Sequence, residues 1–216
     1  MPRIPVPDFL LRTLSRQLSG PSGVLGGFVA RMLNKGNAGV IAAAVEALEL
    51  SGGERVADIG FGGGLGLDLL LDAVGQDGRV YGVEPSPDML ARARRMHDDD
   101  LESGRLELDE TTMDRLPFPD EALDGWISLN TVYFIEELAP ALAELHRVLA
   151  PSGRAVLGIA DPDWMATQPF TRHEFTIRPV DDVAAALRDV GLDVEQRRVG
   201  GGARAYRLLV CSRARS

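Results

Sequence analysis

The feature that most limits the fold is a change of pattern at Arg55, where short apolar segments suited to β-strands begin to alternate with segments of helical spacing. The first three segments are RVADI at 55–59, LGLDLLLDAV at 65–74 and RVYGV at 79–83. Parallel strands need a crossover connection, usually a helix, to return to the same edge of a sheet. The alternation therefore predicts an α/β fold with a mostly parallel sheet and helices on both faces.

The last two strand-like segments depart from this alternation. They are LDVEQRRV at 192–199 and ARAYRLLVCS at 203–212, and only three glycines separate them. Such a short connection joins antiparallel strands, so we expect a hairpin at one end of the sheet with the last strand antiparallel. Cys211 is the only cysteine of the chain and is expected to be a small core residue of that strand.

The first fifty residues have apolar residues at helical spacing. We expect helices near 10–18, 25–33 and 38–50, which together form a helical cap over 1–50. The 216 residues suit one domain, so this cap is expected to belong to the same domain as a core over 51–216. Prolines and charges interrupt the amino terminus, which therefore lacks the apolar core of a signal peptide, and we expect a cytoplasmic location.

Charge and hydropathy argue against several partners. The net charge of −9 is unfavourable for a general nucleic-acid surface, which needs clustered Lys and Arg. Apolar stretches stay well below the roughly 18 residues of a membrane-spanning helix. The three histidines and single cysteine have no metal-ligand spacing. The sequence thus predicts no nucleic acid, membrane or metal partner and leaves monomer and homodimer open.

A glycine-rich turn, VADIGFGGGLGL at 56–67, follows the first strand and is the main candidate site. The dinucleotide fingerprint needs glycines at offsets 0, 2 and 5, but a start at Gly60 or Gly62 places leucine at the last position. A P-loop needs a lysine and a hydroxyl residue after the glycines, which this turn lacks. Neither phosphate-binding turn fits.

The residues that remain form the pattern D-x-G-x-G-x-G, with Asp58, Gly60, Gly62 and Gly64. This pattern resembles the first motif of the class I S-adenosylmethionine-dependent methyltransferases, which have a seven-stranded, Rossmann-like sheet. The resemblance implies that these residues and Phe61 hold S-adenosylmethionine. That cofactor carries cationic groups and no phosphate, so close backbone and a carboxylate are suitable partners.

The resemblance also implies an acidic residue at the end of the second strand, where RVYGVEPSPDML places Glu84, 20 residues after Gly64. Glu84 is expected to accept hydrogen bonds from the ribose hydroxyls, with Pro85 beside it. Ser86 and Pro87 are a helix N-cap and first helical residue. Met89 in that helix is expected to touch the adenine or to lie in the core. The triplet Asp98-Asp99-Asp100 is expected to mark the solvated end of the same helix.

Two further segments extend the resemblance over about 55–160. TTMDRLPFPDEALDGWISLN at 111–130 and ELHRVLAPSGRAVLGI at 144–159 are similar to stretches common in small-molecule enzymes of this family. The first implies that Thr112 and Met113 lie at the adenine, where the family often has Asp-Ala. Asn130 ends the fourth strand and is expected either to face the ligand crevice or to be a turn residue.

The remaining candidates surround a substrate. A Gly-Asn-Ala turn before the first core helix resembles the leader of some bacterial methyltransferases, so Asn37 is expected to face the cofactor or to cap the helix. The segment 161–179 is rich in aromatic residues and is expected to be a lid over the substrate. Tyr133 and His173 are weak catalytic candidates, with packing and a surface position as their alternatives.

The resemblance therefore implies transfer of a methyl group from S-adenosylmethionine to a small organic molecule. Alignment of the reactants can supply much of the catalysis, so no base is required by the pattern. Two alternatives remain: a protein that binds the cofactor without methyl transfer, and an NAD-dependent oxidoreductase, which the missing third glycine disfavours. The absence of a cysteine cluster argues against arsenic methylation.

Overall fold

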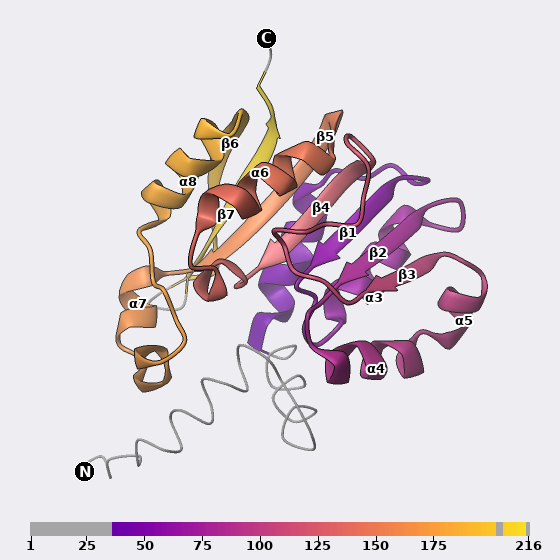
Figure 1. The fold of residues 1–216 in the computed structure, drawn as a ribbon, viewed down its shortest axis with the longest axis horizontal. Helices are drawn as coiled ribbons and strands as arrows, with labels where there is room; N and C mark the ends of the chain where they lie inside the picture. The colour runs from indigo at the N-terminus through magenta and orange to yellow at the C-terminus, as the bar shows by residue number, and fades with distance from the viewer. Residues whose placement is uncertain (1–35, 202–204, 215–216) are drawn as a thin grey trace.

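The computed structural model describes residues 36–201 and 205–214 and contains one seven-stranded sheet (Figure 1). The strand order is β3-β2-β1-β4-β5-β7-β6. The strands are β1 (Arg55–Ile59), β2 (Arg79–Val83), β3 (Leu106–Asp109), β4 (Leu123–Leu129), β5 (Leu149–Ala160), β6 (Leu192–Val199) and β7 (Tyr206–Arg213). The first five pair in parallel, whereas β7 is antiparallel to both β5 and β6. The predicted fold and the terminal antiparallel hairpin are confirmed.

Helices cover both faces of the sheet, as Figure 1 shows. The core on one face includes residues of α6 and α8, and the core on the other face includes residues of the helix over 36–47, α3 and α4. The helices are α3 (Leu65–Val74), α4 (Pro87–Met96), α5 (Asp98–Glu102), α6 (Leu138–Val148), α7 (Pro162–Ala166) and α8 (Val180–Asp189), with 3-10 turns η1 (Val132–Phe134) and η2 (Pro169–Arg172). Because β1 and β4 are covered on both faces, their side chains form nearly continuous buried runs.

The second strand and the helix after it begin as their sequence predicts. The Ser86 hydroxyl accepts a hydrogen bond from the Met89 backbone N–H at 3.4 Å, and Pro87 is the first helical residue. The expectation for the aspartate triplet is wrong, since α4 ends at Met96 and Asp98 begins the separate helix α5. Carboxylates in a first helical turn lie near the positive end of the helix dipole, which explains why a new helix starts there.

The helix over residues 36–47 is the described part of the predicted cap. It confirms the third predicted helix, which ends earlier than expected, before Glu49 with its positive φ of 56°. The expected Gly-Asn-Ala turn is wrong, because residues 36–38 are helical. The helices expected near 10–18 and 25–33 lie outside the described residues.

The carboxyl ends of the five parallel strands meet at one edge of the sheet, where β1 lies between β2 and β4. The chain leaves β1 toward β2 and later returns to β4 on its other side, which makes this the topological switch point at which such folds bind ligands. The segment 161–179 reaches the same edge from β5 and contains α7 and η2. Within the described part of the chain, no helix has the length and apolarity to cross a membrane.

Candidate functional site

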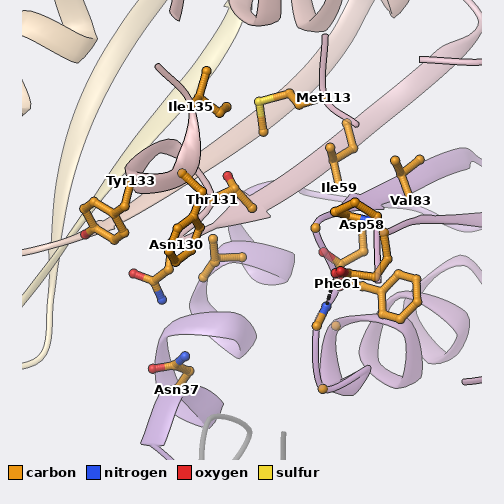
Figure 2. A pocket seen from close by; sticks show the side chains of 18 of the residues that line it. Asn37, Asp58, Ile59, Phe61, Val83, Met113, Asn130, Thr131, Tyr133 and Ile135 are labelled. Carbon is orange, nitrogen blue, oxygen red and sulfur yellow. Dashed lines mark hydrogen bonds between the residues drawn. The ribbon is translucent and has the colours of Figure 1, made fainter. Parts of the chain in front are cut away.

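A cavity of about 340 Å³ lies at the carboxyl edge of the sheet (Figure 2). Its walls come from the segments that follow β1, β2, β3, β4 and β5, from the helix over 36–47, and from Tyr206 at the start of β7. In Figure 2, Asp58 and Phe61 lie at one side of the cavity, whereas Tyr133 lies at the other. Five separate strand ends thus contribute to one pocket.

The glycine turn lies on the Asp58 side of the cavity, and hydrogen bonds join it to the end of β2. The Gly60 N–H donates to the Val83 carbonyl at 2.7 Å, and the Gly62 N–H donates to Glu84 Oε2 at 3.0 Å. Gly60 has a φ of 78°, and a side chain there would collide with the methyl group of Thr131. Only glycine can therefore bring the turn this close to the end of β4.

Asp58 is the last residue but one of β1, directly before this turn, and it is only 4% exposed. Gly66, in the first turn of α3, leaves the space that the Asp58 carboxylate occupies, since a Cβ at Gly66 would overlap Asp58 Oδ2. Burial, and then the nearby charge of Glu84, raise the pKa of Asp58 to about 8. Such a carboxyl group would favour a cationic partner, which would draw it into its charged form.

Glu84 is the second buried acid, 5% exposed, and it lines the same pocket. Its two oxygens accept hydrogen bonds from the backbone N–H groups of Gly62 and Ser86, both at 3.0 Å. Burial raises the pKa of Glu84, while these two hydrogen bonds act in the opposite direction. The backbone thus fixes both oxygens of the carboxylate at the end of β2.

Most of the other residues proposed to hold the cofactor also line the cavity, namely Phe61, Pro85, Thr112, Met113, Asn130 and Asn37. Asn130 has a φ of 60°, a strained conformation that asparagine tolerates better than most residues. Its side-chain Nδ2 donates to the Tyr206 hydroxyl at 3.4 Å, and that hydroxyl donates to Asn37 Oδ1 at 2.8 Å. This chain of hydrogen bonds joins the first described helix to the end of β4 and the start of β7.

Three proposed residues do not reach the cavity. Gly64 is outside the lining and serves as the N-cap of α3, with a φ of 87°. Met89 is 2% exposed on the buried face of α4, so its core alternative is correct. His173 follows η2, half-buried, and is also outside the lining, so the structure gives no support to its role as a base.

Tyr133 does line the cavity, but its hydroxyl is already engaged. It accepts a hydrogen bond from the Ala160 N–H at 2.8 Å and donates to the Ala160 carbonyl at 3.3 Å. Burial raises the pKa of Tyr133 above its usual value, which disfavours the phenolate. Tyr133 therefore fastens η1 to the end of β5 and is poorly suited to act as a base.

The Tyr133 side of the cavity is apolar and aromatic. Phe175 is its central ring, with its centroid 4.8 Å from that of Phe134, 5.7 Å from that of Phe170 and 5.9 Å from that of Tyr133. Trp164 and Met165 of α7 line the same region, so the expected lid segment does form a wall of the pocket. Among the described residues, no group of three or more His, Cys, Asp or Glu could hold a metal ion.

The sequence interpretation missed Gly66, Thr131, Phe134 and Tyr206 as pocket residues. A signal existed for Gly66, because a glycine inside a helical segment usually has a packing reason. Tyr206 could not be found from local sequence, since it reaches the pocket through its pairing with Ala160 in the sheet.

Comparison with known proteins gives one domain match and many structural neighbours. Residues 57–157 match the methyltransferase domain family Methyltransf_11. The arsenite methyltransferase of Halobacterium salinarum is 34% identical over 154 residues, which are 65% of this chain and 38% of that protein. The chain covers less than half the length of the first curated relatives it matches.

Two solved structures resemble the fold over most of their length. A putative methyltransferase of Haloferax volcanii, in complex with the activator Trm112, has a TM-score of 0.74 at 22% identity, covering 86% of this chain and 94% of its own. A SAM-dependent methyltransferase of Aquifex aeolicus has a TM-score of 0.69 at 21% identity, with coverages of 93% and 97%. The domain match over residues 57–157 and the sheet topology together support a class I, Rossmann-like S-adenosylmethionine-dependent methyltransferase.

Proposed function

We propose that the protein transfers a methyl group from S-adenosylmethionine to a small organic molecule. The observation that carries this proposal is the pair of buried acids, Asp58 and Glu84, on either side of a turn of bare backbone. Two carboxylates without a neighbouring cation are suited to a ligand that brings positive charge and hydroxyl donors. They are poorly suited to the phosphates of NAD, because the described lining contains no Lys or Arg.

The residues present fit the cofactor. Asp58 would pair with the cationic groups of the cofactor, and Glu84 would accept hydrogen bonds from its ribose hydroxyls. Thr112 and Met113 would contact its adenine. Gly66 leaves the space that the Asp58 carboxylate occupies, and both residues line the pocket. When bound, S-adenosylmethionine supplies a methyl group activated by a sulfonium leaving group.

The protein contributes alignment and the exclusion of water to this reaction. The ionisable side chains in the described lining are Asp58, Glu84, Tyr133 and Tyr206. The two acids lie at the glycine turn, and the hydroxyl of Tyr133 is bonded to Ala160. We therefore propose that the acceptor reaches the pocket already nucleophilic, so that the pH dependence of kcat/KM follows the ionisation of the acceptor.

A small acceptor is supported by the concave, aromatic side of the cavity, which is enclosed by α7, η1 and η2 of this chain. The Haloferax volcanii neighbour was solved with an activator protein, so activity that depends on a second protein is the competing arrangement. The test is to incubate the purified chain alone with S-adenosylmethionine and a panel of small organic acceptors and to measure S-adenosylhomocysteine. Acceptor-dependent release supports the proposal, and release only with a partner protein or a macromolecular acceptor contradicts it.

A second candidate is cofactor binding without methyl transfer, which the lack of an evident base in the described lining favours. The assay of S-adenosylhomocysteine release distinguishes this candidate from methyl transfer. Tight cofactor binding with no methylated product from acceptors that are already nucleophilic, such as thiolates and neutral amines, would favour this candidate.

A further inference from the structure

We propose that the aromatic side of the cavity is an acceptor subsite for a flat, uncharged ring system, with Phe175 as its specificity-determining residue. This inference rests on the proposed function, since it names the class of the acceptor. The subsite is defined by Tyr133, Phe134, Trp164, Phe170 and Phe175, all of which line the cavity.

The geometry of the rings points to recognition of another ring. The planes of Phe134 and Phe170 are each inclined by 63° to that of Phe175, and the plane of Tyr133 by 37°. Aromatic rings favour such edge-to-face and offset contacts, and a ligand ring can extend the cluster in the same way. An aliphatic ligand of the same size would make the apolar contacts but would lose this preference.

The subsite is held in place by the protein itself. The guanidinium of Arg178 donates to the carbonyls of Val132, Ile135 and Glu136 at 2.9, 2.7 and 2.8 Å. The Thr176 N–H donates to the Tyr133 carbonyl at 2.8 Å. These contacts fasten the segment after η2 to η1, so hydrogen bonds within the protein place Phe175 against Tyr133 and Phe134. A preformed site costs less ordering on binding than one that the ligand must assemble.

Charge distribution determines which ring systems fit. Within the described lining, the aromatic side has no charged side chain, and the hydroxyl of Tyr133 is engaged with Ala160. A charged acceptor would therefore lose its hydration without gaining an ion-pair partner on this side. An anion would in addition meet the two acids of the same pocket, so an aromatic carboxylate is disfavoured most strongly. A neutral aromatic amine meets both requirements, since it is uncharged and nucleophilic without loss of a proton, and 2-naphthol serves below as an uncharged probe of binding alone.

The test uses four probes on the full chain saturated with S-adenosylhomocysteine, with calorimetric titration as the readout. They are 2-naphthol, its saturated analogue decahydro-2-naphthol, the anion 2-naphthoate and the cation trimethyl-2-naphthylammonium. We expect 2-naphthol to bind at least about fivefold more tightly than each of the others. Equal or tighter binding of the saturated alcohol or of either ion would overturn the proposal.

Two variants test whether 2-naphthol binds at the aromatic subsite. Phe175→Leu should weaken 2-naphthol at least about fivefold while the affinity for S-adenosylhomocysteine changes by less than about twofold. Phe118→Leu is the matched control, because Phe118 makes an edge contact with Tyr81 at 5.2 Å outside the cavity lining and should leave 2-naphthol binding unchanged. If Phe175→Leu does not fold, Phe170→Leu takes its place.

The same titrations distinguish failure of the proposed function from failure of the aromatic subsite. A wild-type chain that does not bind S-adenosylhomocysteine contradicts the cofactor assignment, and the naphthol titrations on the ligand-free chain still decide whether the aromatic subsite exists. Normal binding of S-adenosylhomocysteine with no binding of 2-naphthol overturns only the subsite.

Discussion

The two sides of the pocket differ in chemistry and in how the chain builds them. The acidic side comes from two short stretches, residues 58–66 and 84–85, and it presents backbone and two buried carboxylates. The aromatic side combines η1, α7 and η2 with residues that follow them, and it presents rings without charge. The comparison shows how a sequence motif can identify one half of a site while the other half depends on tertiary packing.

The largest effect is expected at Gly66. In Gly66→Ala the new Cβ would overlap the Asp58 carboxylate, so the acid must move and cofactor affinity should fall at least about thirtyfold. Calorimetric titration with S-adenosylmethionine measures this loss. The matched control is Gly39→Ala, where the helix over 36–47 has open space and alanine should stabilise the chain by up to about 1 kcal/mol. An unchanged affinity in Gly66→Ala would contradict the role of Asp58.

Glu84→Ala separates the two sides of the pocket. It removes an acceptor whose burial makes its hydrogen bonds strong, so cofactor affinity should fall at least about tenfold. Binding of 2-naphthol should change by less than about twofold, because the aromatic side does not contact Glu84 directly. Equal losses for both ligands would show that the two sides are not independent, and an unchanged cofactor affinity would remove Glu84 from the site.

The pH dependence of stability tests Asp58. Its pKa is raised to about 8 in the folded chain, from an ordinary value of 3.8, so between these values the folded state holds a proton that the unfolded state has released. The free energy of unfolding should therefore fall with rising pH between these two values. Asp58→Asn lacks this dependence, and its stability relative to wild type should rise by about 1 to 3 kcal/mol from pH 5 to pH 8.

Chemical denaturation of both cofactor-free proteins at several pH values measures that difference. A constant difference across this range would mean that Asp58 is charged in the folded chain without its ligand. Addition of S-adenosylmethionine should reduce the difference at pH 8, because a cationic ligand stabilises the charged carboxylate only in wild type.

The smallest effect is expected for Tyr206→Phe. This variant removes the hydroxyl that bonds Asn37 and Asn130, and two neutral hydrogen bonds near the pocket contribute about 1 kcal/mol each at most. Affinities for cofactor and 2-naphthol should both fall by about two- to fivefold, since the hydroxyl holds Asn37 and Asn130 in the wall of the shared pocket. A tenfold or larger loss for only one ligand would assign Tyr206 to that side of the pocket.

The sequence predicted what local pattern determines. The strand and helix alternation, the terminal hairpin, the cap at Ser86 and the glycine turn all depend on neighbouring residues. Gly64 lies outside the pocket lining, where its conformation serves to start α3, and Met89 takes the core position that its sequence had left open. Tyr206 could not be assigned in this way, because sheet pairing brings it to the site. Phe175 lies in the predicted lid segment, but its place among the rings depends on the contacts of Arg178.

The most direct test is calorimetric titration of the purified chain with S-adenosylmethionine, S-adenosylhomocysteine and NAD. We expect micromolar binding of the first two and none of the third, because Asp58 and Glu84 favour a cationic ligand without phosphate. Binding of NAD alone, or of none of the three, would contradict the assignment of the glycine turn to S-adenosylmethionine.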